Sequence, residues 1–268
     1  MNKVQNDCQL KTRYQRLIED TRGYTVWTTV EERKTCPTAN TAVLLCDVWD
    51  NHPFRGAVER LEAMIPRMNR VVAEARARGA TIIHAPSDTM NFYADSPARI
   101  RTCSVPMTEP PTDIDHPDPP LPFDAKVNGS DTGETDKTRN WTRQHPDVEI
   151  DEDTDFVTDV GKEVYSILKH RQIEWLLIMG VHTTMCILHR SFAIKQMARW
   201  GVDVALIRDL TDAIYNPAIP PYVSHDEGTQ LAVGFIEKHW CPSVHSEDLL
   251  RFRIVGANPD VEKIRIVE

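Results

Sequence analysis

Short apolar runs alternate with amphipathic stretches along the chain, and this alternation constrains the fold more than any other feature. Apolar residues dominate four runs that we predict to be strands: Ala42–Val48, Thr81–Ala85, Trp175–Val181 and Val202–Ile207. The first and third are almost continuously apolar, as expected of parallel strands that are buried on both faces. A weaker run, Val148–Ile150, is a further strand candidate.

Helical periodicity fills the segments between these runs. In Ala57–Arg78 the apolar residues recur mostly three or four positions apart, with Gly79 at the C-cap position and Pro66 predicting a kink or a break. We predict further helices at Val160–Lys169, Thr184–Trp200 and Glu227–His239. Strands that alternate with helices indicate an α/β fold, a three-layer α/β/α arrangement with a doubly wound, mainly parallel sheet.

The 268 residues show no internal repeat, and we expect one domain with its core at about 41–240. Residues 103–146 form a long connection in which seven of the 18 prolines fall between Pro106 and Pro122. Such a connection is typically a functional loop, a lid or an oligomer arm, and a domain boundary is the alternative. Trp27 and Arg251–Val255, in the extensions 1–35 and 251–268, indicate that both ends pack on the core or on a partner chain.

Composition excludes several classes of partner. The chain has 31 Lys and Arg against 40 Asp and Glu, a net charge of −9, which argues against a non-specific nucleic-acid or anionic-membrane surface. No window approaches the roughly 18 apolar residues of a membrane span, and the first residues lack the apolar region of a secretory signal. The six cysteines include no CxxC pair, which favours reduced thiols. We therefore expect a cytoplasmic protein whose partner is a small molecule.

Candidate chemistry lies where predicted parallel strands end, since ligands bind beyond the carboxyl ends of such strands. Asp47 closes the first run, and Gly180–Cys186 joins the third run to a helix. With Thr183 as N-cap, Cys186 would lie in the first helical turn, where the helix dipole and free N–H groups favour a thiolate and an oxyanion beside it.

Asp47 is costly in an apolar setting unless it is paired or functional, and next to a thiol it accepts the proton. The alternative is a buried structural cysteine and an Asp that merely caps a turn. His182 and His189 are other candidate bases for a Cys–His dyad. Trp49, Phe92 and Tyr93 follow strand ends and either line a substrate pocket or belong to the core or an interface.

The turn Gly180-Val181-x-Thr183-x-x-Cys186, combined with Asp47, resembles the isochorismatase-like cysteine hydrolases, which include nicotinamidases and N-carbamoylsarcosine amidohydrolase. The resemblance covers roughly Thr41 to Trp240 in element order. It implies Cys186 as nucleophile, Asp47 as general base, and an oxyanion hole shaped by a cis peptide at Val181–His182. The implied reaction is hydrolysis of a C–N bond in a small amide or ureido compound through a thioester, by a homodimer or homotetramer.

The sequence departs from the family at the third catalytic residue, a Lys that ends the strand before Asp151–Asp159. Here that strand reads Val-Glu-Ile-Asp, and Lys162 comes only later, in the next predicted helix. Lys126, Lys137 and Arg143 are candidates to supply the cation from the long loop. Two alternatives therefore remain: a non-catalytic ligand-binding or assembly member of the fold, and a vinyl-ether hydrolase of the isochorismatase type, which does not need the Cys.

We expect neither a metal nor a cofactor. Nicotinamidases hold a divalent ion with an Asp-x-His pair and another His after the second strand, which His84–Asp88 does not reproduce; Asp50-x-His52 follows a different strand. Asp151, Asp153 and Asp155 open like an EF-hand loop, but Phe156 and Lys162 occupy its Gly and Glu positions, which favours a solvated acidic turn. The chain has no GxGxxG after a strand and no GxxxxGK[ST].

Overall fold

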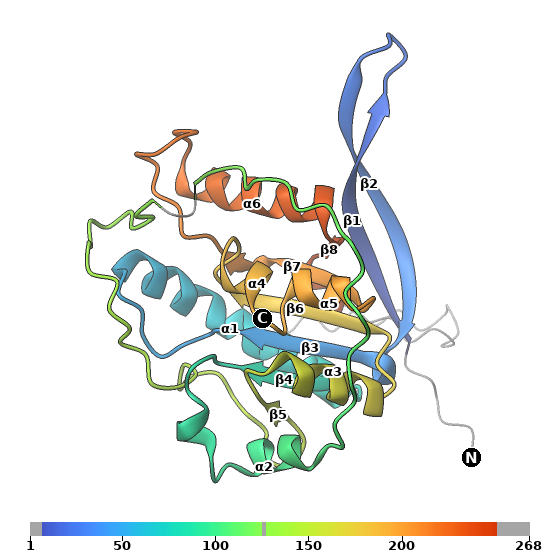
Figure 1. Cartoon of the computed structure of the whole chain (residues 1–268), viewed down its shortest axis with the longest axis vertical. Helices are drawn as coiled ribbons and strands as arrows, with labels where there is room; N and C mark the ends of the chain where they lie inside the picture. The colour runs from blue at the N-terminus through green and yellow to red at the C-terminus, as the bar shows by residue number, and fades with distance from the viewer. Residues whose placement is uncertain (1–6, 125–126, 251–268) are drawn as a thin grey trace, which may run out of the picture.

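The computed structural model describes residues 7–124 and 127–250, which are built around an eight-stranded sheet of order β2-β1-β8-β7-β6-β3-β4-β5 (Figure 1). Neighbouring strands from β8 to β5 run parallel, and β1 joins β8 and β2 in antiparallel fashion. The strands are β1 (Asp7–Glu19), β2 (Thr25–Pro37), β3 (Thr41–Cys46), β4 (Thr81–Ala85), β5 (Phe156–Val157), β6 (Trp175–Val181), β7 (Asp203–Asp212) and β8 (Ser243–Val244).

Helices cover both faces of this sheet, which confirms the predicted three-layer α/β/α fold. On one face, α1 (Arg55–Ala77) and α7 (Ser246–Leu250) share a core with alternate residues of β3, β4, β6 and β7. On the other face lie α3 (Gly161–His170), α4 (Cys186–His189), α5 (Ile194–Arg199) and α6 (His225–His239), packed on the remaining strand residues. The last helix, α2 (Pro97–Ser104), packs beside β5, and short 3-10 helices span Thr38–Asn40 and Met90–Tyr93.

Helix α1 continues through Pro66 without the break that the sequence allowed. Pro66 and Glu62, four residues before it, both face solvent, while Leu61, Ile65 and Met68 are buried. Because Pro66 has no N–H, the Glu62 carbonyl lacks its hydrogen bond within the helix, and it lies on the solvent-exposed side. The buried apolar stripe on the opposite side keeps the helix in one piece.

Two other predictions about elements are wrong. Residues 148–150 form no strand, because the Val148 N–H closes a turn on the His145 carbonyl and the Glu149 N–H donates to Asn69; the strand at this edge is β5. The helix predicted over 184–200 is divided into α4 and α5, with Arg190 in an extended conformation after α4. The division lets Ser191 approach Gly161 so closely that a Cβ at position 161 would collide with the Ser191 carbonyl.

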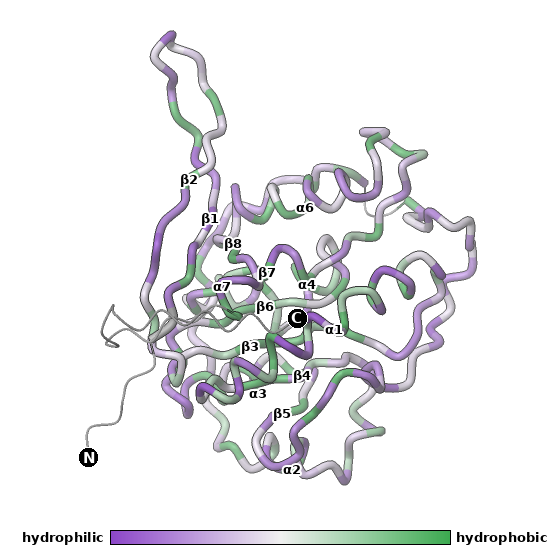
Figure 2. Tube along the Cα trace, turned by 180° about the vertical axis from the view of Figure 1, so that it is seen from behind, coloured by the Kyte–Doolittle hydropathy of each residue, from purple (hydrophilic) through white to green (hydrophobic). Residues whose placement is uncertain are grey.

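The N-terminal extension forms a long β1–β2 hairpin that projects from the body of the molecule (Figures 1 and 2). Its base is held by one pair with β8, Arg13 to Ser243. Trp27 packs its ring edge against His239 of α6 at 5.8 Å between centroids, so this end of the chain does pack on the body, as expected. The other expected contact, Arg251–Val255, lies outside the described residues.

The long Pro-rich connection packs back on the helices. Asp113 accepts hydrogen bonds from Gln196 and Trp200, and Asp118 pairs with Lys195 at 2.6 Å, so this part of the loop lies along α5 (Figure 1). Further along, Asp131 pairs with Arg60 of α1 at 2.7 Å. The loop thus reaches helices on both faces of the sheet. No helix in the described part of the chain is long and apolar enough to cross a membrane.

Candidate active site

The site lies where the order of the strands reverses. From β3 the chain moves outward through β4, whereas β6, β7 and β8 extend the sheet on the other side. Because β3 and β6 are parallel neighbours, with Cys46 opposite Gly180, Asp47 and the turn after β6 meet at the same edge. Gly180 has φ 121°, and a Cβ there would collide with the Cys46 carbonyl, so only glycine fits this close approach.

Asp47 is fully buried, and three groups surround its carboxylate. One oxygen, Oδ1, accepts a hydrogen bond from the Ser87 backbone N–H at 2.8 Å. The other, Oδ2, accepts from Nε of Arg190 at 2.8 Å. The Cys186 thiol faces the same carboxylate, and the charge of Asp47 raises the pKa of the thiol. The structure therefore brings together the two residues that the sequence singled out, Asp47 and Cys186, and adds Arg190.

Burial and charge determine how the protons are held. Burial raises the pKa of Asp47, and the charge of Arg190 opposes this effect. Burial, and then the charge of Asp47, raise the pKa of Cys186 well above its ordinary value. Free of substrate, the pair keeps the proton on sulfur, ready for transfer to Asp47.

The expectation that a helix start lowers the Cys186 pKa is wrong. Helix α4 has only four residues and begins at Cys186 itself, with Met185 at the N-cap position, so its dipole is small. Thr183 is not the cap: its Oγ1 hydrogen-bonds Oγ1 of Thr211 at 2.8 Å. Burial therefore has a larger effect on the pKa of Cys186 than the helix terminus has.

The turn before Cys186 carries unused hydrogen-bond donors. The Val181–His182 peptide bond is cis, as the resemblance implied. The backbone N–H groups of Thr183, Met185 and Ile187 all have carbonyl acceptors, whereas in the described part of the chain those of Thr184 and Cys186 have none. The Thr184 hydroxyl is also buried without a partner among the described residues. These are the groups an oxyanion and its substrate would need.

A cavity of about 480 Å³ opens beside the nucleophile candidate. Its lining consists of Leu121, Thr184, Met185, Cys186, His189 and Arg190. Leu121 comes from the long Pro-rich loop, so this loop forms one wall of the cavity.

The aromatic residues proposed as pocket walls are absent from this lining. Trp49 is buried and stacks on Trp141 of the loop at 4.1 Å between ring centroids. Tyr93 is buried too, and its hydroxyl accepts a hydrogen bond from the Gln144 backbone. Phe92 is 56% exposed, because the 3-10 helix at Met90–Tyr93 turns it outward.

The three cations proposed from the sequence are not the ones found at Asp47. The Arg143 guanidinium lies over the Phe92 ring, 5.3 Å from its centroid. Lys137 is exposed on the loop, and Lys126 lies outside the described residues. Lys162 pairs with Glu109 at the surface, as expected of a helix-surface residue. Sequence reasoning missed Arg190, although its position four residues after Cys186 is the spacing of neighbours on a helix face.

The histidines near the site are held neutral. Burial, and then the charge of His52, lower the pKa of His182 to about 3; burial lowers that of His52 to about 4. Burial also lowers the pKa of His189, which lines the cavity. No imidazole ring of the three hydrogen-bonds the Cys186 thiol in the described structure; His182 reaches it through its backbone, a contact that opposes the rise in the thiol's pKa. Asp47 is therefore the base beside the sulfur.

No group of three His, Cys, Asp or Glu side chains within residues 7–124 and 127–250 is arranged to hold a metal ion. Both ring nitrogens of His84 are engaged, Nδ1 by Gln144 and Nε2 by Asp155, each at 3.0 Å. Asp155 is itself buried and pairs with Arg76 at 2.6 Å. It therefore belongs to an internal ion pair, not to the solvated turn that the sequence indicated.

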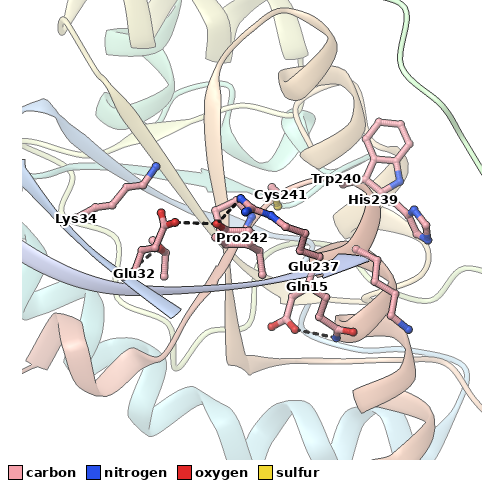
Figure 3. A pocket seen from close by; sticks show the side chains of 12 residues that line it. Gln15, Glu32, Lys34, Glu237, His239, Trp240, Cys241 and Pro242 are labelled. Atoms are coloured by element: carbon pink, nitrogen blue, oxygen red, sulfur yellow. Dashed lines mark hydrogen bonds between the residues drawn. The ribbon is translucent and has the colours of Figure 1, made fainter. Parts of the chain in front are cut away.

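A second cavity, of about 440 Å³, lies where the hairpin joins α6 and β8 (Figure 3). It contains neither Cys186 nor Asp47. The buried carboxylate of Glu237 accepts hydrogen bonds from Arg13, Gln15 and Ser243, so the polar groups beneath this cavity are satisfied by one another. These contacts fix the base of the hairpin on the body.

The chain is similar to several solved structures at low sequence identity. A cysteine hydrolase from Pseudomonas syringae pv. phaseolicola is 15% identical, with a TM-score of 0.48, and the match covers 82% of this chain and 95% of that one. An isochorismatase family protein from Burkholderia thailandensis is 13% identical, with a TM-score of 0.45 and coverage of 79% and 96%. The pyrazinamidase of Pyrococcus horikoshii, solved in complex with zinc, is 16% identical, with a TM-score of 0.44 and coverage of 77% and 99%.

No curated protein matches the chain. The family model for the isochorismatase domain, in contrast, matches residues 41–218, which is more than half of the sequence. The matched segment begins with β3 and includes Asp47, the cis turn and Cys186. The chain belongs to the isochorismatase family.

Proposed function

We propose that this protein is a cysteine hydrolase that cleaves a C–N bond in a small amide or ureido-type substrate. The observation that carries the proposal is the buried Asp47 carboxylate beside the Cys186 thiol, next to a turn with unused N–H donors. A thiol with an adjacent base and nearby oxyanion donors is suited to acyl transfer. The cavity at Cys186 provides room for a small substrate.

In this mechanism Asp47 takes the thiol proton while the sulfur forms a bond to the substrate carbonyl carbon. The carbonyl electron pair moves to oxygen, which the backbone N–H of Cys186 stabilises. As the tetrahedral intermediate collapses, the C–N bond breaks and Asp47 gives its proton to the leaving nitrogen. Water then attacks the thioester, with Asp47 accepting its proton, and the thiol is restored as the acid leaves.

The test is ammonia release from a panel of primary amides and N-carbamoyl compounds. We expect hydrolysis by the wild type, a loss of at least about 1,000-fold in C186S and of at least about 100-fold in D47N, with circular dichroism unchanged. Hydrolysis retained by C186S would overturn the proposal. A folded wild type that hydrolyses no member of the panel would also contradict it, in favour of a ligand-binding role or vinyl-ether hydrolysis.

We also retain as proposals a cytoplasmic location, a homodimeric or homotetrameric state and the absence of a resident cofactor. The apolar residues left exposed on the hairpin, Leu17 at 51% and Trp27 at 43%, support self-association. A second copy packed against the hairpin would bury these apolar side chains.

A further inference from the structure

The family's catalytic Lys has no counterpart at the expected strand, yet the site holds a cation. Arg190 directly follows helix α4, in an extended conformation with ψ 151° that ends the helix. Its Nε donates to Asp47 at 2.8 Å and its second terminal nitrogen to Asp88 at 3.4 Å. The same side chain lines the cavity beside Cys186. One arginine thus contacts the base and borders the space for the substrate.

The surroundings fix this guanidinium in place. Its central carbon lies 5.8 Å from the centroid of the Trp49 ring, a cation–π distance. Trp49 is held in turn by stacking on Trp141 and by donating its indole N–H to the Ser87 carbonyl at 3.0 Å. The Ser87 backbone N–H donates to the other oxygen of Asp47. The backbone of Ser87 therefore positions both the carboxylate and, through Trp49, the guanidinium.

Burial disfavours the ionised form of Asp47, so the charged groups around the carboxylate decide whether it can act as a base. The titratable and charged groups that face it are Cys46 on its own strand and Cys186 and Arg190 from the segment after β6, with Asp88 behind Arg190. Burial, together with the charge of Asp47, raises the pKa of both thiols, so at neutral pH neither supplies or neutralises charge. Arg190 is the positive group in contact with the carboxylate, and an arginine stays protonated throughout the physiological range.

We propose that Arg190 replaces the family's Lys as a positioning residue: it keeps Asp47 ionised and aimed at the thiol, and it balances the negative charge that moves to sulfur. Asp88 holds the outer end of the guanidinium. The role rests on the proposed function, because it presumes that Asp47 takes a proton from Cys186. Arg190 follows helix α4, so this cation reaches Asp47 without any residue from the segment 148–151, where the family's Lys was expected.

The first test needs no substrate. Infrared difference spectroscopy of R190M at about pH 7 should show the C=O stretch of a protonated carboxylic acid, since a buried, unpaired Asp47 takes up a proton. The band should be missing from the wild type, from R190K and from the double variant R190M/D47N. Should R190M not fold, R190Q removes the charge while retaining a hydrogen-bond donor and gives the same comparison.

The second test uses a substrate found with the ammonia assay. We expect R190M to lower kcat/KM by at least about 100-fold, with the acidic limb of the pH profile displaced to higher pH, and R190K to recover to within about tenfold of the wild type. R199M is the matched control. Arg199 is also 30% exposed, pairs with an Asp, and lies over a tryptophan ring, but its partners are Asp118 and Trp240. R199M should keep wild-type kcat/KM.

The outcomes separate the two claims. If R190M lacks the acid band, or if its pH profile matches that of the wild type, Arg190 does not hold Asp47 ionised, and this inference fails even when C186S has proved the cysteine mechanism. If C186S keeps full hydrolysis while R190M shows the band, the proposed function fails and the electrostatic part of the inference stands.

Discussion

At Asp47, burial and charge act in opposite directions. Burial raises the pKa of the carboxylate, and the guanidinium of Arg190, at 2.8 Å, opposes this rise. The same burial raises the pKa of Cys186, so the nucleophile stays a thiol until a substrate arrives.

Thr184 and Thr183 lie side by side in the turn but should respond in opposite ways to the same substitution. The Thr184 hydroxyl is buried without a partner in the described structure, at the cavity wall. T184V should therefore raise the free energy of unfolding by about 1 kcal/mol, and should lower kcat/KM by about tenfold because the substrate loses a hydrogen bond.

T183V is the control for this change. Thr183 Oγ1 pairs with Thr211 at 2.8 Å, and its valine variant leaves that hydroxyl without its partner. Urea denaturation should show a loss of about 1–3 kcal/mol. If T184V destabilises the protein as much as T183V does, the Thr184 hydroxyl is not free for a substrate.

Among the elements, the approach of β3 to β6 fixes the distance between base and nucleophile. Gly180 allows it, because its φ is positive and its missing Cβ makes room for the Cys46 carbonyl. G180A should destabilise the protein by at least about 3 kcal/mol or prevent folding, since backbone must move.

G79A separates crowding from backbone strain. Gly79 also has a positive φ, of 92°, but a Cβ there would meet open space. This variant should cost only about 1 kcal/mol in urea denaturation. If G79A and G180A lose the same free energy of unfolding, the close approach of β3 to β6 does not require a glycine at position 180.

The strands that carry the site were predictable from local pattern, and the rest depended on contacts between distant residues. β4 and β6 begin and end as predicted, since a buried strand shows as a short apolar run. The division of the 184–200 helix depends on Gly161 meeting Ser191, which no periodicity reveals. The hairpin was missed because its strands are largely exposed and polar, without a clean apolar alternation. Asp47 and Cys186 were found because each follows a buried strand, whereas Arg190 was missed although it follows Cys186 by four residues, the spacing of neighbours on a helix face.

For the molecule as a whole, neutral buried histidines make stability depend on pH. The pKa of His182 is lowered to about 3, so below its ordinary value of 6.5 the unfolded chain binds a proton that the folded chain does not. His52 acts in the same direction. His225, whose pKa is raised because the hydrogen bond and charge of Asp212 outweigh burial, has the opposite effect and loses its contribution as the pH rises.

The free energy of unfolding should therefore fall as the pH is lowered from about 6.5 to about 5, by up to about 1.4 kcal/mol per pH unit for His182 once the unfolded form is fully protonated. Urea denaturation across this range measures it, and H52Q should reduce the slope. Proton NMR should show the His182 ring not titrating above about pH 4. A stability that stays level over this interval would contradict the assignment of neutral histidines.

The central claim is that Cys186 forms a covalent acyl intermediate. The most direct measurement is the intact mass of the protein, quenched in acid within its first turnovers on a substrate from the ammonia assay, followed by peptide mapping. We predict a mass increase equal to the acyl part of the substrate, on the peptide that contains Cys186, and none in C186S. Ammonia release by the wild type with no adduct at Cys186, together with undiminished release by C186S, would contradict the account.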